Sequence, residues 1–203
     1  MPPQPLLIRP ARADDAAAIA QVVNAAYRPA PGKEGWTHES ALVAGERTCT
    51  EAVAALIAAS DNGSVVLAGL MDDAPVACVL IEQETDGAHI GMLAVAPTLQ
   101  TAGLGRRLLG AAEDWARDRL GAYTARLTVI DARPELKAFY LRRGYRDSGQ
   151  RIAYPAGGAT GQTRAPAICA IVDCCTVTGT ASATRWRMRS RSAAAEPPSC
   201  ADS

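Results

Sequence analysis

The segment from Gln100 to Arg107 has the composition of a phosphate-binding turn. It follows an apolar stretch that stops at Pro97, carries Gly103 and Gly105, and leads into a helical pattern headed by two arginines. Backbone N–H groups in the first turn of a helix have no partner within the helix, and the helix dipole favours an anion there. Glycine lets the backbone approach such a ligand closely. The segment therefore predicts a phosphate or pyrophosphate site, although two glycines before a helix also suit an ordinary turn.

Composition excludes several classes of partner. The chain has 203 residues, a hydrophobic fraction of 48% and a formal net charge of +0. This balance gives no basic surface for nucleic acid, and the few aromatic residues offer little for base stacking. The N-terminus lacks a charged segment followed by an apolar one, and no apolar run is long enough to span a bilayer. We therefore expect a cytoplasmic protein that binds neither nucleic acid nor a membrane.

The cysteines and histidines do not form a metal-binding pattern. The 6 cysteines show no Cys-x-x-Cys spacing, and 2 histidines leave little to complete a zinc site. We expect reduced thiols and no metal.

Apolar periodicity and turn residues predict an ordered series of strands and helices. Strands are expected at residues 6–9, 64–70, 76–84, 88–95, 126–130 and 145–152, and helices at 17–27, 36–44, 50–59, 104–119 and 135–142. Short turns join the second, third and fourth strands, which implies antiparallel neighbours, whereas the helix between the fourth and fifth favours a parallel crossover. The fold class predicted is α+β, with a mixed, mostly antiparallel sheet and flanking helices.

Two signatures in this order resemble the GCN5-related N-acetyltransferases, the GNAT superfamily. Gln100-x-x-Gly103-x-Gly105 is similar to the family's pyrophosphate motif, Gln/Arg-x-x-Gly-x-Gly/Ala. Residues 136–145, with Phe139-Tyr140 ahead of a Gly-Tyr pair, resemble the signature of the helix and turn that follow the splayed strand. The resemblance covers residues 6–155, to which we assign an N-acetyltransferase domain. It implies a GNAT-like acyl-CoA N-acyltransferase fold with a splayed central strand pair.

The resemblance also implies acetyl-CoA as the acetyl donor. The backbone of Leu93, Ala94 and Val95 would then bind the pantetheine and the acetyl carbonyl where the strands splay, and an N–H there would stabilise the oxyanion. The side chains of Leu93 and Val95 equally suit the core. The pyrophosphate would lie against Gln100, Thr101, Ala102, Gly103, Leu104, Gly105 and Arg106, with Arg107 as a further candidate. Arginine at a helix N-terminus opposes the dipole, and a bound anion would explain its placement.

Catalytic roles follow from the same resemblance. Tyr140 matches the family tyrosine that gives a proton to the leaving thiolate, with packing beside Phe139 as the alternative. The acceptor amine must lose a proton before it attacks, and Glu82, Glu84 and His89 are the candidate bases. Strand alternation places Glu82 and Glu84 on one face, but acids beside a turn are commonly solvated, so the base stays open.

The acceptor site is expected between the early helices, where aromatic and charged residues lie among Gly and Pro. Its candidates are Tyr27, Trp36, His38, Glu39 and Arg47. Arg47 could bind a substrate carboxylate or pair with Glu46 or Glu51. The sequence does not identify the amine.

The composition changes after Pro155. Residues 156–203 hold four of the 6 cysteines and a series of arginines. Residues 167–178 are apolar and β-branched enough to supply a last strand, and the remainder is expected to be disordered. We interpret this tail either as a divergent or frame-shifted end or as a segment that binds acidic partners.

Together these features predict an acetyl-CoA-dependent N-acetyltransferase. It would transfer the acetyl group directly to a primary amine of a small molecule or peptide. The alternative is a non-catalytic CoA-binding or regulatory module with the same fold. Monomer and homodimer are both open.

Overall fold

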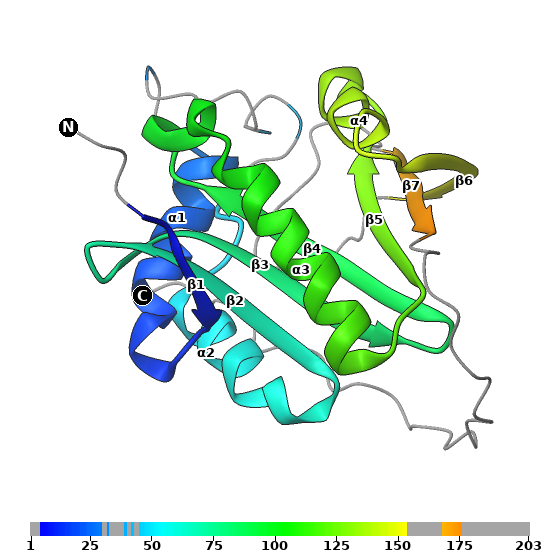
Figure 1. The fold of residues 1–203 in the computed structure, drawn as a ribbon. Helices are drawn as coiled ribbons and strands as arrows, with labels where there is room; N and C mark the ends of the chain where they lie inside the picture. The colour runs from blue at the N-terminus through cyan, green and yellow to red at the C-terminus, as the bar shows by residue number, and fades with distance from the viewer. Residues whose placement is uncertain are drawn as a thin grey trace.

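The computed structural model describes residues 5–29, 32, 39, 42, 45–153 and 168–175. Its strands are β1 (Leu7–Pro10), β2 (Ser64–Met71), β3 (Ala74–Glu84), β4 (Gly87–Val95), β5 (Thr124–Ile130), β6 (Arg146–Ala153) and β7 (Ile168–Cys175). Within these residues they form one sheet in the order β1-β2-β3-β4-β5-β7-β6 (Figure 1). Each neighbouring pair is antiparallel except β4 and β5, which run parallel. The predicted α+β fold with a mixed, mostly antiparallel sheet is confirmed.

Helices cover both faces of the sheet. They are α1 (Ala16–Tyr27), α2 (Thr50–Ala58), α3 (Leu104–Leu120) and α4 (Pro134–Leu141), with short 3-10 turns η1 (Ala13–Asp15), η2 (Ala59–Asn62) and η3 (Pro97–Ala102). In Figure 1, α3 crosses in front of the strands while α1 and α2 lie behind them. The helix predicted over residues 36–44 lies outside the described residues, apart from Glu39 and Leu42.

Alternation along the central strands explains why both faces are covered. In β2, Val65 and Leu67 join the apolar cluster of α3, whereas Val66 and Ala68 join the cluster of α1. Successive side chains of a strand point to opposite faces, so an unbroken apolar run needs cover on each side. The sheet is therefore buried in the middle of the molecule.

Helix α3 forms as its periodicity predicts. Leu104, Leu108, Leu109, Ala112 and Ala116 form its buried stripe, at the spacing of one helical face. The helix starts after Gly103 and ends at Gly121, and both glycines have the left-handed backbone that other residues adopt at a cost. This helix fixes the position of the glycine-bearing turn at its N-terminus.

Strand β7 is supplied by the apolar run at residues 167–178, as expected. It pairs with β5 over the whole of β5, from Thr124 to Ile130, and with β6 on its other side. The far half of the sheet, β5-β7-β6, is thus completed by a segment that follows residue 155.

One expectation about the cysteines is wrong. Cys49 is disulfide-bonded, whereas reduced thiols were expected throughout. Cys78 and Cys169 are free and buried, and burial raises the pKa of Cys78 to about 12. Because sequence spacing reveals only local pairs, a long-range disulfide leaves no signature in it.

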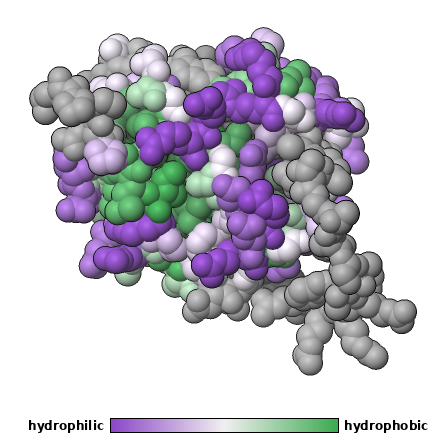
Figure 2. All heavy atoms as spheres, in the orientation of Figure 1, coloured by the Kyte–Doolittle hydropathy of each residue, from purple (hydrophilic) through white to green (hydrophobic). Residues whose placement is uncertain are grey.

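Hydrophilic side chains cover much of the face shown in Figure 2, with an apolar area on the side where β1 lies. Within the described ranges, no helix combines the length and apolar character needed to cross a membrane.

Candidate active site

Strands β4 and β5 diverge to open a gap in the sheet. They pair only near their starts, Ala88 with Ala125 and His89 with Arg126. We call this paired end the closed end of the gap. Gly87 lets the two strands approach there, because a Cβ at that position would lie 2.4 Å from the carbonyl oxygen of Thr124. β5 pairs with β7 along its other edge, and beyond His89 the edge of β4 that faces β5 has no strand partner among the described residues. The splayed strand pair is confirmed, and it exposes backbone groups that a ligand can bind as a substitute strand.

A bulge interrupts β4 at the open end of this gap. Ala94 pairs with Cys78 and Gly91 with Leu80, so Met92 and Leu93 together stand opposite a single residue of β3. Met92 has a φ of 47°, a left-handed conformation that is strained for a non-glycine residue. The bulge turns backbone groups out of the ladder with β3.

Tyr27 approaches the bulge from α1. Its hydroxyl donates a 2.8 Å hydrogen bond to the carbonyl oxygen of Leu93, and burial raises its pKa well above the ordinary value. The guanidinium of Arg47 lies 5.7 Å from the centre of the Tyr27 ring. Two of the five predicted acceptor residues are therefore together, while Trp36 and His38 lie outside the described residues.

The turn after β4 forms a cradle of backbone amides. Helix α3 begins at Leu104 without a side-chain cap, which leaves its first N–H groups available to an anion. Gln100 steadies the turn, because its side-chain amide donates to the carbonyl oxygen of Val95 at 3.1 Å. The cradle and the open edge of β4 are continuous.

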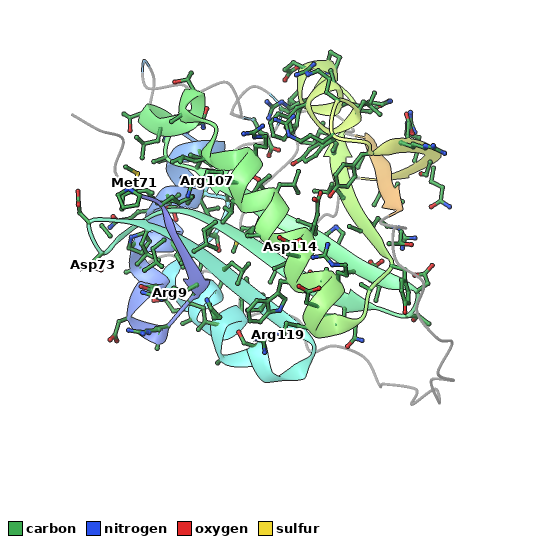
Figure 3. The ribbon with its side chains drawn as sticks, in the orientation of Figure 1. Arg9, Met71, Asp73, Arg107, Asp114 and Arg119 are labelled. Atoms are coloured by element: carbon green, nitrogen blue, oxygen red, sulfur yellow. The ribbon has the colours of Figure 1, made fainter. Side chains whose placement is uncertain are left out.

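The two arginines at the start of α3 have different surroundings. Arg106 lines the pocket that the turn borders. Arg107 turns away toward β1, as Figure 3 shows, and donates to the carbonyl oxygen of Leu6 at 3.2 Å. Arg107 is therefore bonded to the chain just before β1, whereas Arg106 borders the pocket.

This pocket, of about 170 Å³, joins the cradle to α4. It is lined by Leu93, Val95, Gln100, Thr101, Gly103, Gly105, Arg106, Leu136, Phe139, Tyr140 and Arg143. Of the predicted cofactor residues, Ala94, Ala102 and Leu104 are not in the lining, and the side chains of Ala94 and Leu104 are buried in the core. The structure thus brings together most of the turn, the β4 bulge and Tyr140.

Tyr140 lies in the wall of the pocket and is 5% exposed. Its ring packs edge-on against Phe139 at 5.2 Å and against Tyr145 at 5.6 Å between ring centres. Burial raises the pKa of Tyr140, while the nearby charges of Arg143 and Arg133 lower it. The phenol therefore keeps its proton at neutral pH.

Arg143 is a pocket residue that sequence reasoning missed. Its guanidinium stacks 3.4 Å from the centre of the Phe139 ring and donates to the Phe139 carbonyl oxygen at 2.6 Å. Burial lowers its pKa, and the charges of Arg142 and Arg106 lower it further. Two cations thus face one pocket, which suits a polyanionic ligand. The neighbouring Phe139-Tyr140 signature drew attention to the helix but gave no sign of this arginine's orientation.

The structure does not bring Glu82 and Glu84 to the pocket. Glu82 lies 3.6 Å from His89, across the β3–β4 ladder, and Glu84 accepts a 2.7 Å bond from Arg126. Both acids stand near the turn at the closed end of the gap, several residues along β3 from the bulge. In the described ranges no cluster of acidic, histidine or cysteine side chains could hold a metal ion.

Comparison with known proteins agrees with this geometry. A sequence model of the Acetyltransferase (GNAT) family matches residues 22–145, which is more than half of the chain. No match is found among curated proteins.

Three solved structures illustrate the shared fold. The ribosomal-protein-S18-alanine N-acetyltransferase from Escherichia coli has a TM-score of 0.64 at 17% identity, over 89% of this chain and 100% of its own. An N-acetyltransferase from Thermoplasma acidophilum, solved with coenzyme A, gives 0.64 at 16%, over 84% and 99%. A mutant spermidine N-acetyltransferase from Vibrio cholerae gives 0.61 at 14%, over 84% and 94%. With its splayed sheet, its glycine turn and the match over residues 22–145, the chain belongs to the GNAT acetyltransferase family.

Proposed function

We propose that the protein transfers an acetyl group from acetyl-CoA to a primary amine of a small molecule or peptide. The observation that carries this proposal is that one pocket is shared by the β4 bulge, the uncapped start of α3 and Tyr140. A narrow ligand with a thioester at one end and phosphates further along would meet complementary groups over its length. Coenzyme A in the Thermoplasma relative and family membership support the choice of donor.

The residues present fit such a donor. The unpaired edge of β4 offers N–H and C=O groups to an amide-bearing chain, and the first amides of α3 with Arg106 offer positive charge to a pyrophosphate. The backbone at Gly105 has open space beside it, since a Cβ there would meet only Val95, at the van der Waals distance of 3.8 Å. When bound, acetyl-CoA supplies an activated acetyl thioester, whose C–S bond breaks as the amine nitrogen forms a bond to the carbonyl carbon.

Three groups of the chain would assist this transfer. A backbone N–H at the bulge of Met92 and Leu93 donates to the carbonyl oxygen as it gains charge. Tyr140 gives a proton to the departing sulfur and regains one from solvent. Glu82, Glu84 and His89 do not line the pocket, and in this proposal the amine loses its proton to water.

Titration calorimetry with acetyl-CoA and mass spectrometry of an amine panel test this proposal. We expect binding, transfer to at least one amine, and a loss in kcat of about 100-fold or more in Tyr140→Phe with unchanged CoA affinity. Tyr123→Phe is the matched control, because Tyr123 lies on the surface and is 61% exposed. Folded protein that fails to bind acetyl-CoA would overturn the proposal, and binding without transfer to any amine would favour the non-catalytic module.

A further inference from the structure

The side of the bulge opposite Tyr140 carries a positioned arginine. Asn24 of α1 accepts hydrogen bonds from the backbone N–H groups of Arg47, at 2.8 Å, and Thr48, at 3.1 Å, and donates to the Thr48 carbonyl at 2.8 Å. These three bonds fix the backbone of Arg47 beside α1. Its guanidinium then rests against the Tyr27 ring, whose hydroxyl bonds to Leu93 at the bulge.

Arg47 has no acidic partner in the described part of the chain. It forms no ion pair with Glu46 or Glu51, which the sequence offered as alternatives to a substrate carboxylate. The positive charge of Arg47 lowers the pKa of Tyr27, and the negative charge of Glu39 raises it. Both charges therefore act on the Tyr27 hydroxyl. The groups that act on Tyr27 also include Tyr140 and Cys78, which are neutral at pH 7 because burial raises their pKa values.

The nearby carboxylate of Glu39 is already neutralised. It accepts a 3.0 Å bond from Arg28, and the two side chains are 9% and 7% exposed respectively. The backbone N–H of Glu39 also donates to the Tyr27 carbonyl at 2.9 Å, which holds the pair against the end of α1. A buried pair of this kind has no net charge to attract a cationic substrate, and separating it would leave an uncompensated charge.

Of the two charged groups that act on Tyr27, Glu39 is therefore paired with Arg28, and Arg47 is the cation that lies against the ring. We propose that the acceptor is an amine that also bears a carboxylate, as an amino acid does, and that Arg47 binds this carboxylate. The inference rests on the proposed acetyl transfer. Arginine matches a carboxylate with two parallel N–H donors, and its stacking on Tyr27 limits the conformations it must give up on binding. A polyamine would instead bring positive charge toward Arg47 and be disfavoured.

Pairs of acceptors that differ in one group test this inference directly. Each amino acid is compared with its own carboxamide, and spermidine serves as the polycation, with acetyl-CoA saturating. We expect kcat/KM for the amino acids to exceed that for their amides by about 10- to 100-fold, the range of a charged hydrogen bond. The difference should lie mainly in KM, because the carboxylate takes no part in bond formation.

Substitutions then assign the effect to Arg47. Arg47→Gln should raise KM for amino acids about 10-fold or more and leave KM for the amides and the affinity for CoA unchanged, while Arg47→Lys should restore part of the loss. The matched control is Arg119→Gln. Arg119 also stacks on an aromatic ring, that of Trp115 at 5.2 Å, but lies near the far end of α3 from the turn (Figure 3).

The outcomes separate this inference from the proposed function. Equal rates for acids and amides, a preference for spermidine, or an Arg47→Gln variant that keeps the acid preference would each overturn the inference while acetyl transfer stands. Absence of transfer to every amine tested would overturn both.

Discussion

The Tyr27 hydroxyl and the Leu93 carbonyl oxygen are joined by a 2.8 Å hydrogen bond that ties α1 to the bulge of β4. The two residues are far apart in the sequence, and their bond satisfies a carbonyl that the bulge has removed from the β3–β4 ladder. The bond therefore helps to hold the strained backbone at Met92 in place. It links the face of the sheet that α1 covers to the pocket beside α3 and α4.

Replacing Tyr27 with Phe removes this bond and leaves the Leu93 carbonyl without that donor. We expect the free energy of unfolding to fall by about 1–2 kcal/mol, the usual cost of a buried group left unpaired. Chemical denaturation measures this, with Tyr123→Phe as the control on the surface. Equal stability of Tyr27→Phe and the wild type would show that the bond contributes nothing to the fold.

Gly87→Ala tests the closed end of the gap between β4 and β5. Its Cβ would lie 2.4 Å from the Thr124 carbonyl, so the strands must shift, and we expect a loss of about 1–3 kcal/mol in stability. Gly110→Ala is the control: that glycine lies within α3 with no atom close to the added Cβ, and alanine there should stabilise the helix by up to about 1 kcal/mol. Two variants with the same change in stability would contradict the assigned role of Gly87.

The neighbours Arg106 and Arg107 should respond differently to substitution. Arg106→Gln removes a charge from the pocket, so we expect the Kd for CoA to rise about 10-fold and its dependence on salt to weaken. Arg107→Gln removes a bond to the Leu6 carbonyl and should lower stability by about 1 kcal/mol with little effect on the Kd. Calorimetry at two salt concentrations, paired with denaturation, distinguishes the two. An Arg107 variant that binds CoA as poorly as the Arg106 variant would reverse these roles.

The pH dependence of transfer tests the assignments of acid and base. Burial raises the pKa of Tyr140, so this phenol keeps its proton as the pH rises toward its ordinary value of about 10. The rate should therefore increase with pH as the amine loses its proton, without a decline caused by Tyr140. Glu82→Gln and Glu84→Gln should keep this profile, because both acids lie outside the pocket. A large fall in kcat with loss of the acidic limb in either variant would instead identify that carboxylate as the base.

The sequence predicts the framework well because the signals for it are local. Apolar runs bounded by turn residues identify β2, β3 and β4, and the stripe of Leu104, Leu108 and Ala112 together with Gly103 identifies α3 and its turn. Tyr140 and Arg106 were found through motifs whose residues stand close together in the chain.

The features of the site that the sequence did not predict depend on strand register and on contacts between distant segments. Alternation gives the face of Glu82 and Glu84 but not their distance from a bulge in the next strand. A methionine in a left-handed conformation has no sequence signal, so the bulge at Met92 was not foreseen. The direction of Arg143 is set by its stacking on Phe139, which only the folded helix end creates.

The position of β7 in the sheet determines when the sheet can be completed during synthesis. β7 is the last of the described strands to leave the ribosome, yet it lies between β5 and β6, both of which emerge earlier. Until residue 175 is available, β6 lacks the neighbour that joins it to the sheet, and β5 presents a bare edge to other chains. Completion of the sheet therefore awaits a long-range pairing, which slows folding and makes the nascent domain dependent on its own C-terminal segment.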